Sequence, residues 1–397
     1  MSTKKRPTVR LQPRHDARVR HGHPWAFSNE IMMDAEAKAI ASGTPVTLTT
    51  AGGDRLGAGW FNPHTLIAAR VLTADTDTVI DRAFYARRIQ AALSLRERLY
   101  AEPYYRLVHA EADGLPAVVI DRMGDVLVVQ LNAAGPNLAE PDIVGALVEV
   151  LNPKAIVLKN DSPARTLEGL PIETRLAHGE LTGPVELIEN GARFQVDPLE
   201  GQKTGWFYDQ RDSRAFVARF AAGRTVLDAY CYGGGFGIEA AMVGAKSVTL
   251  LDRSAGALEA AGRSAALNGV ADRCAVRQQE VFEALAAMAT AGETFDVVIV
   301  DPPAFAKSRK DIPTAVKGYR KLVRQAAALV PPGGILFAAS CSHNVGVLEF
   351  SEAVARGLAD AGRAGRVLRT AGAGPDHPVH PMLPESAYLK SLTLALD

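Results

Sequence analysis

The second half of the chain alternates short apolar runs with segments of helical periodicity. From about residue 193 onward, mostly apolar runs are followed by stretches in which apolar residues recur every three or four positions. The pattern predicts strands at 225–230, 246–252, 274–280, 295–301, 334–341, 366–371 and 388–396, and helices at 236–243, 255–267, 281–291, 316–329 and 348–359. Near-continuous apolar strands that alternate with helices are typical of a parallel sheet covered on both faces. We therefore expect an α/β fold in which ligands bind at the carboxyl ends of the strands.

The first half of the chain has a different pattern. Short β-type segments at 45–50, 55–61 and 66–72, separated by Gly and Pro turns, predict a small β-barrel. A helical period then begins near residue 81, and the strand-like and helical runs that follow it predict a small central α+β domain. These changes of pattern predict three domains, at residues 1–75, 76–190 and 191–397.

Composition narrows the class of protein. The 397 residues include 44 Lys+Arg and 44 Asp+Glu, so overall charge alone would not hold the chain on nucleic acid. A hydrophobic content of 47% excludes a mainly disordered chain, and no apolar run approaches the roughly 20 residues of a membrane span. The N-terminus lacks the apolar region of a secretory signal, and three cysteines are too few for a disulfide framework. We therefore expect a cytoplasmic protein with no membrane partner.

The first 20 residues form a basic arm. They carry seven positive side chains and one negative side chain. Such an arm is either a solvated segment or a segment that contacts phosphates, where each neutralised phosphate releases counterions. The charge pattern by itself leaves both interpretations open.

Two of the predicted strands end in a pattern suited to a nucleotide-like ligand. The first ends at Asp228 and runs into three consecutive glycines before a helix, a turn that lets a ligand approach the backbone and the helix N-terminus. The second ends at Asp252, where a carboxylate commonly binds ribose hydroxyls. Plain turns are the alternative, but the two features together favour a ligand that contains adenosine. The consecutive glycines do not form the GxGxxG motif of nicotinamide enzymes, which disfavours an oxidoreductase.

Two further strand ends carry reactive groups. The fourth strand ends in Asp301 followed by two prolines, which stiffen the exit and aim the carboxylate. The fifth ends at Cys341 between two serines, and we expect it to lie beside the Asp301 loop. A cysteine is often only packing, but this position favours a functional thiol. Cys231 is expected only to pack within the glycine loop, and Cys274, which begins a strand, is expected in the core.

The sequence offers little for a metal. It has no Cys-x-x-Cys pair, and His377 and His380 lie in a proline-rich loop without matching ligands. We therefore expect no metal site, and a rigid loop at 376–381.

Eight segments in order resemble a known family. They are residues 19–31, 59–72, 106–125, 203–214, 227–236, 301–308, 340–343 and 376–390. With them the chain resembles the class I S-adenosylmethionine-dependent methyltransferases, and most closely the bacterial 23S rRNA 5-methylcytosine methyltransferases that carry an N-terminal PUA domain. The resemblance implies a PUA β-barrel, a central α+β domain with a β-β-α-β-β core, and a seven-stranded Rossmann-like methyltransferase sheet.

The resemblance also implies roles for particular residues. It implies that S-adenosylmethionine is the cofactor, that Asp228 and the glycines hold its methionine part, that Asp252 takes the ribose and that Glu280 lies near the adenine. It implies that Cys341 is the nucleophile and that Asp301 hydrogen-bonds the target base. The implied cofactor-binding set is Phe207, Asp209, Gln210, Arg211, Asp228, Tyr230, Gly233, Gly234, Gly235, Phe236, Asp252, Arg253, Glu280 and Asp301.

The expected reaction is methyl transfer to C5 of a cytosine in 23S rRNA. C5 is a poor nucleophile until a thiolate adds to C6, and an ordinary cysteine is only a few per cent thiolate at neutral pH. Cys341 therefore needs a group that stabilises its thiolate, which the sequence does not identify. Many RNA 5-methylcytosine enzymes have a second cysteine after the proline of this motif, where this chain has Pro303 and Ala304. The group that removes the C5 proton is therefore also unassigned, with His343 and Lys307 as candidates.

The substrate contacts are open in the same way. The PUA-like domain and the basic arm are expected to grip RNA, and the target base must leave its stack to reach the thiol. Trp25, Phe27 and Trp60 are expected to be core residues rather than stacking platforms. A homodimer is left open.

Two other functions compete with this one. A methyltransferase acting on a ring or exocyclic nitrogen usually has an aromatic residue directly after Asp-Pro-Pro, where this chain has Ala304, and it would give Cys341 no role. A non-catalytic RNA-binding or ribosome assembly factor could keep the fold without turnover. The intact set of Asp228, Asp252, Asp301 and Cys341 argues against that loss of activity.

Overall fold

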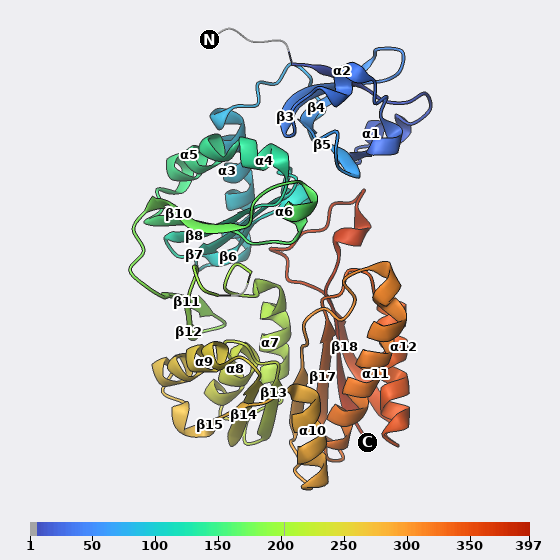
Figure 1. Cartoon of the computed structure of the whole chain (residues 1–397). Coiled ribbons are helices and arrows are strands. Elements are labelled where there is room, and N and C mark those ends of the chain that lie inside the picture. The colour runs from blue at the N-terminus through green and yellow to red at the C-terminus, as the bar shows by residue number, and fades with distance from the viewer. Residues whose placement is uncertain (1–5, 202) are drawn as a thin grey trace. The chain divides into compact units, whose positions relative to one another are not determined.

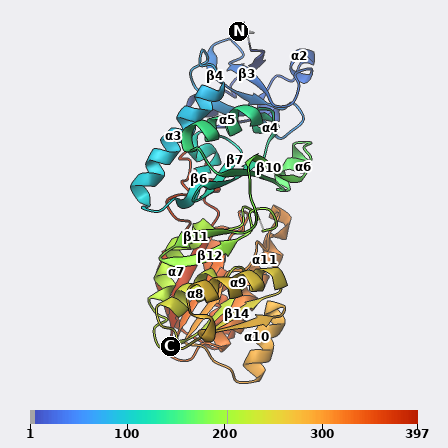
Figure 2. The ribbon, with the colours of Figure 1, turned by 90° about the vertical axis from the view of Figure 1, so that its left-hand side faces the viewer.

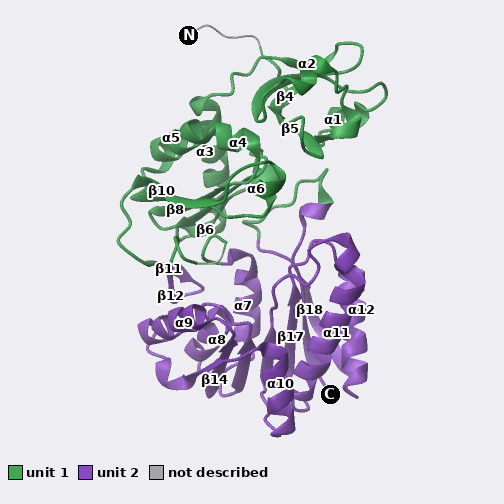
Figure 3. Cartoon of the chain, viewed as in Figure 1, with its two compact units in different colours: residues 1–185, 197–206, 375–384 green, residues 186–196, 207–374, 385–397 purple. Residues whose placement is uncertain are grey.

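The computed structural model describes residues 6–201 and 203–397 of the chain. Residues 1–5, and with them Lys4 and Lys5 of the basic arm, lie outside the described residues. The chain divides into two compact units, residues 1–185, 197–206 and 375–384 in the first and residues 186–196, 207–374 and 385–397 in the second (Figure 3). No helix within the described ranges is long and apolar enough to cross a membrane.

The first unit begins with a five-stranded sheet in the order β1-β3-β4-β5-β2. Its elements are β1 Thr8–Arg10, α1 Ala17–Arg20, β2 Trp25–Phe27, α2 Ala35–Lys38, β3 Thr44–Thr49, β4 Arg55–Phe61 and β5 Ile67–Thr73. Apolar side chains that alternate along these strands share one core, which includes Val9, Val46, Leu48 and Phe61. Trp60 is buried, as expected, and stacks on Tyr85 of the following helix at 6.4 Å between ring centroids.

Trp25 and Phe27 are less buried than expected. Both are half-buried, and the Trp25 indole N–H donates to a carboxylate oxygen of Glu111 at 2.9 Å. The expectation that they are core residues was therefore only partly right. Trp25 uses its polar edge to join the first sheet to the central part of the same unit.

A second five-stranded sheet, ordered β10-β9-β8-β7-β6, completes the first unit. The elements are α3 Arg82–Leu99, β6 Tyr104–His109, β7 Val118–Met123, β8 Val126–Leu131, α4 Ala134–Leu138, α5 Glu140–Leu151, β9 Ala155–Asn160, α6 Ala164–Leu167 and β10 Glu173–Gly179. The Asp81 side chain caps α3 by accepting the Phe84 N–H at 2.9 Å. Apolar residues of α3 and α5 share one core with the strands β6 to β9. Figure 2 shows the ribbon of this unit from a second side.

A buried ion network ties residues 375–384 into this unit. Arg96 of α3 makes a bidentate pair with Asp113 at 2.5 and 2.7 Å and also donates to the backbone oxygen of Asp376 at 2.9 Å. The Asp376 carboxylate accepts the Arg106 backbone N–H at 2.9 Å and pairs with the His377 ring at the same distance. Within the described residues, no cluster of histidine, cysteine and carboxylate side chains is arranged to hold a metal.

The second unit contains a seven-stranded sheet in the order β15-β14-β13-β16-β17-β19-β18 (Figure 1). Its strands are β13 Thr225–Ala229, β14 Ser247–Asp252, β15 Cys274–Gln278, β16 Val297–Val300, β17 Ile335–Ser340, β18 Gly365–Ala371 and β19 Lys390–Leu396. Its helices are α7 Arg211–Ala218, α8 Gly235–Met242, α9 Ala255–Leu267, α10 Val281–Thr290, α11 Ile312–Ala328 and α12 Val347–Asp360. A hairpin of β11 Val185–Glu189 and β12 Ala192–Val196, which the sequence pattern did not predict, precedes α7.

Alternation along β13 explains how helices cover both faces of the sheet. Leu227 and Ala229 share a core with α10, α11 and α12. Asp228 faces the other way, where its carboxylate accepts the Gly237 N–H of α8 at 2.8 Å. The expected α/β fold with a seven-stranded sheet is confirmed. Cys274 was expected in the core, but it is only half-buried because β15 is an edge strand.

Candidate active site

The loop between β13 and α8 is shaped by backbone conformations that side chains rarely adopt. Gly234 has φ +82°, and Tyr230 and Tyr232 also have positive φ values of 63° and 48°. A left-handed backbone costs a non-glycine residue about 1 kcal/mol or more, and such costs concentrate at ligand-binding loops. The glycine expected to permit a tight turn is therefore accompanied by two strained tyrosines that the sequence did not reveal.

Asp228 is the buried carboxylate of this edge. Burial raises its pKa to about 7, against the opposing effects of the Gly237 N–H and the Arg214 guanidinium. The nearby Asp301 and Asp252 carboxylates raise it further. The structure thus brings the acidic ends of three strands, β13, β14 and β16, into electrostatic contact, as the parallel order predicted.

Asp252 is positioned by the backbone around it. Its two oxygens accept the N–H groups of Tyr232, at 3.1 Å, and of Ser254, at 2.9 Å. It is half-buried, so lone pairs remain for a ligand. The charges of Asp252, Glu280 and Arg253 all act on the hydroxyl of the half-buried Tyr230, whose pKa is raised mainly by burial.

The segment before α7 contacts the glycine loop. The Phe207 ring packs edge-on against Tyr232 with centroids 5.3 Å apart. The Asp209 carboxylate accepts a hydrogen bond from the Tyr388 hydroxyl at 2.5 Å. Segments that are far apart in sequence therefore meet at this edge of the sheet.

Cys341 lies at the end of β17, where its thiol contacts the loop after β16. Its Sγ is 3.8 Å from the backbone oxygen of Pro302, the residue that follows Asp301. Strands β16 and β17 are parallel neighbours, as expected from the alternating pattern. The side chain is half-buried. The sequence prediction that Cys341 and the Asp301 loop lie side by side is confirmed.

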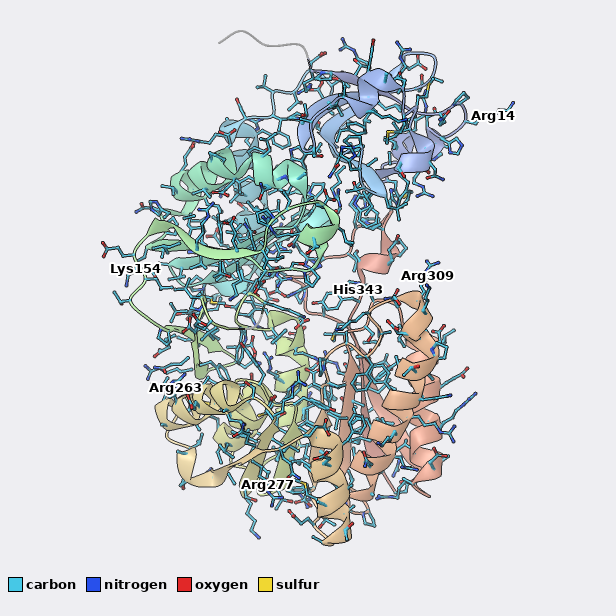
Figure 4. The ribbon with its side chains drawn as sticks, in the orientation of Figure 1. Arg14, Lys154, Arg263, Arg277, Arg309 and His343 are labelled. Atoms are coloured by element: carbon cyan, nitrogen blue, oxygen red, sulfur yellow. The ribbon has the colours of Figure 1, made fainter. Side chains whose placement is uncertain are left out.

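The two serines beside Cys341 fix its strand end. The Tyr319 hydroxyl is 2.8 Å from the hydroxyls of both Ser340 and Ser342, and all three side chains are buried. Ser342 also accepts the Ala306 N–H at 3.3 Å. His343, labelled in Figure 4, is exposed on the next turn of the loop with its ring 5.0 Å from that of Tyr388.

Comparison with known proteins identifies the chain. Residues 159–379 match the model of the S-adenosylmethionine-dependent methyltransferase family, and residues 9–74 match a PUA-like domain. The chain belongs to the S-adenosylmethionine-dependent methyltransferases. This methyltransferase is 39% identical over 389 residues to ribosomal RNA large subunit methyltransferase I of Shewanella amazonensis, covering 97% of this chain and 98% of that protein. It is 37% identical over 389 residues to the protein of the same name from Pseudoalteromonas translucida, with the same coverage.

Solved structures share all or part of the fold of this methyltransferase. A crystal structure of SMU.776 complexed with SAH has a TM-score of 0.84 at 21% identity, covering 98% of this chain and all of that one. Trm5b from Pyrococcus abyssi has a TM-score of 0.53 at 17% identity, covering 70% of this chain and 74% of that one. The expectation that S-adenosylmethionine is the cofactor is confirmed by the family match.

The residues at the glycine loop fit that cofactor. Among the described residues, neither amide atom of the Gln210 side chain has a hydrogen-bond partner, although the side chain is only 2% exposed. An unsatisfied buried polar group costs about 1–3 kcal/mol, which a polar ligand would relieve. The N-terminus of α8 and the Asp228 and Asp252 carboxylates supply groups for an ammonium, a carboxylate and ribose hydroxyls. When bound, the cofactor supplies a methyl group on a positively charged sulfur.

Three further members of the expected cofactor set also make contacts within the protein. The Arg211 guanidinium pairs with the buried Glu189 at 3.3 Å. A Glu280 carboxylate oxygen caps α10 by accepting the N–H groups of Phe282 and Glu283 at 2.8 and 3.3 Å. Phe236 packs its ring 4.9 Å from that of Phe337. Their contact with the cofactor stays a prediction.

Close packing is a second reason, besides the approach of a ligand, for a glycine at position 235. A Cβ built on Gly235 would lie 2.4 Å from Nε of Arg214, a buried arginine paired with Glu189. Sequence reasoning missed this ion pair. It also missed Lys390, which pairs in register with the residue before Cys341, and Tyr388, whose ring lies against that of His343. The one signal for Lys390 was a lysine at the start of an otherwise uncharged strand.

Proposed function

We propose that this methyltransferase transfers a methyl group to C5 of a cytosine in large-subunit ribosomal RNA, with Cys341 as the nucleophile. The observation that carries the proposal is the contact of the Cys341 thiol with the Asp301–Pro302 loop, on the edge of the sheet that also bears Asp228 and Asp252. The names of the relatives and the PUA-like domain support RNA of the large subunit as the substrate.

The thiol has a specific chemical task in this proposal. The Cys341 thiolate forms a bond to C6 and breaks the C5=C6 π bond, so that electron density moves into the ring and C5 becomes nucleophilic. After C5 has taken the methyl group, a base removes the C5 proton. The C5=C6 double bond then re-forms and the bond from sulfur to C6 breaks, which returns the thiolate.

Asp301 acts on the other edge of the base. Its carboxyl group, at the end of β16, would hydrogen-bond the N3 and N4 edge of the cytosine and stabilise the charge of the adduct. His343 stands two residues after Cys341, with its ring against that of Tyr388, and is one candidate for the base that removes the C5 proton. Lys307 is exposed on the Asp301 loop and is the other candidate.

The test is nucleoside mass spectrometry on unmodified large-subunit rRNA incubated with the protein and labelled S-adenosylmethionine. We expect label in 5-methylcytidine with the wild type and with Cys274→Ala, and none with Cys341→Ala. Cys274 is the matched control because it is a half-buried thiol on the edge strand β15. RNA containing 5-fluorocytidine should trap a covalent complex with the wild type and with Cys274→Ala but not with Cys341→Ala, because fluorine at C5 blocks the elimination step.

Other results would redirect the assignment. Label in a nitrogen-methylated nucleoside, undiminished in Cys341→Ala, would reject the thiol mechanism in favour of nitrogen methylation. Binding of rRNA without label in any nucleoside would favour a ribosome assembly role without turnover.

A further inference from the structure

A buried lysine borders the thiol in this site. Lys390 is the first residue of β19 and pairs in register with Ser340, the residue before Cys341. It is 4% exposed. The remaining residues of β19 are apolar or uncharged, so Lys390 brings a charge into an otherwise neutral strand. Burying a lysine costs free energy unless its ammonium is paired and hydrogen-bonded.

The Lys390 ammonium is bound by three backbone carbonyls. It donates to the oxygens of Ser342 and Val345, both at 2.6 Å, and of Tyr388 at 3.0 Å. Three acceptors require three N–H groups, which only the charged form of lysine provides. Two of the three carbonyls belong to the loop that begins with Cys341. The cation therefore fixes the path of the chain immediately after the thiol.

No carboxylate of the described residues lies within ion-pair distance of Lys390. Burial lowers the pKa of Lys390, whereas negative charge on Cys341 and, after it, on Glu349 raises this pKa. The interaction is reciprocal, so the ammonium favours the ionised form of the Cys341 thiol by the same amount.

The other groups that face Cys341 do not supply this charge. Asp301, directly after β16, is acidic and disfavours a thiolate. Glu349 on α12, whose charge acts on Lys390, is also acidic. The Tyr319 phenol on α11 has a pKa raised mainly by burial, so it stays neutral at neutral pH. His343 is exposed on the thiol loop. Of these groups, Lys390 is the one that carries a fixed positive charge while buried.

We propose that Lys390 is a positioning residue for the nucleophile: its ammonium stabilises the Cys341 thiolate and holds the loop that presents it. This inference rests on the proposed function for the statement that Cys341 reacts as a thiolate. It supplies the stabilising group that the sequence left unidentified.

The test follows the reaction of each cysteine with iodoacetamide as a function of pH, by mass spectrometry of the full-length protein. The thiolate is the reactive form, so the rate profile gives the pKa of each thiol. We expect Cys341 in the wild type to titrate below the ordinary value of about 8.5. In Lys390→Met its pKa should rise by about one unit, which lowers the rate at pH 7 about tenfold. Lys390→Arg, which keeps the charge, should restore most of the effect.

Two controls separate charge from general damage. Cys274, whose pKa is raised to about 11 mainly by burial, is an internal reference and should not change in any variant. Lys246→Met removes an exposed lysine of the same unit and should leave Cys341 at its wild-type pKa. A Cys341 pKa in folded Lys390→Met within about 0.3 unit of the wild type would overturn the proposal.

The wild-type profile decides the matter if Lys390→Met does not fold. A Cys341 pKa at or above about 8.5 in the wild type overturns the proposal, and a lower value supports it. This experiment needs neither RNA nor cofactor. If the proposed function is wrong, Cys341→Ala will still form 5-methylcytidine. If this inference is wrong, the pKa of Cys341 will be the same in Lys390→Met as in the wild type.

Discussion

Replacing Gly237 with alanine tests the packing that places Asp228. A Cβ at Gly237 would lie 2.4 Å from Leu250 Cδ2, 2.9 Å from Val248 Cγ1 and 3.2 Å from Asp228 Oδ2. Carbon atoms normally approach to about 3.5–4.0 Å, so the first contact is more than 1 Å too short. Leu250 and Val248 are both fully buried in β14 and cannot turn away into solvent.

The magnitude follows from two opposing effects. Alanine is favoured over glycine in a helix by about 1 kcal/mol, but overpacking a core costs about 1–3 kcal/mol. With two buried side chains in the way, we take the cost at about 2–3 kcal/mol, which leaves a net loss of about 1–2 kcal/mol. Gly262→Ala is the matched control because Gly262 lies inside α9 with nothing within 4 Å of its added Cβ. That change should stabilise the protein by about 0.5–1 kcal/mol.

The assay is thermal and guanidinium unfolding with and without S-adenosylhomocysteine. The two units can unfold separately, and the transition that the ligand shifts is the one that reports on the cofactor-binding unit. The two alanine variants should differ by about 1.5–3 kcal/mol in that transition. Equal stability of Gly237→Ala and Gly262→Ala would refute the reasoning, because α8 would then be able to move off β14 without cost.

Three further predictions follow from buried polar groups. Burial raises the pKa of Asp228 to about 7 in the folded protein, whereas this carboxyl ionises near about 3.9 in the unfolded chain, so its contribution to stability falls as pH rises between those values. The melting temperature of Asp228→Asn relative to wild type should therefore increase from pH 5 to pH 8, and a constant difference would contradict this. Arg96→Met leaves the Asp113 carboxylate buried without its partner and should lower the free energy of unfolding, measured with denaturant, by about 3–5 kcal/mol. Arg98→Met, at an exposed position on the same helix, should lower it by less than about 0.5 kcal/mol, and equal losses for the two variants would show that the network is not stabilising. Gln210→Met removes a buried amide that has no hydrogen-bond partner among the described residues. Calorimetry should find weaker S-adenosylmethionine binding, while the melting temperature without ligand should stay the same or rise; unchanged affinity would exclude Gln210 from the site.

The elements that follow from local pattern were predicted well from the sequence. The strand at 55–61 has the predicted bounds, and β16 and β17 are neighbours as the alternation required. The placement of Cys341 beside the Asp301 loop followed from that adjacency alone. These features depend on periodicity and on the rule that parallel strands end at one edge, both of which are written in short stretches of sequence.

The parts that depend on distant partners could not be predicted. The role of Lys390 depends on β19 entering the sheet antiparallel between β17 and β18, which no local pattern reveals. The positive φ values of Tyr230 and Tyr232 are likewise imposed by the surrounding loop rather than by tyrosine itself. Cys274 was placed in the core because cysteine is usually buried, but the order of the strands puts it at an edge.

The placement of residues 375–384 has a consequence for how the protein is made. The chain passes from one unit to the other at 185/186, 196/197, 206/207, 374/375 and 384/385, so no single cut divides it into two complete pieces. The carbonyl and carboxylate that Asp376 offers to Arg96 and Arg106 leave the ribosome only after most of the second unit has been synthesised. The first unit therefore completes its buried ion network late, although most of its residues are made first. A fragment ending near residue 190 would leave the buried Arg96 guanidinium and the Arg106 backbone N–H each without the acceptor that Asp376 provides.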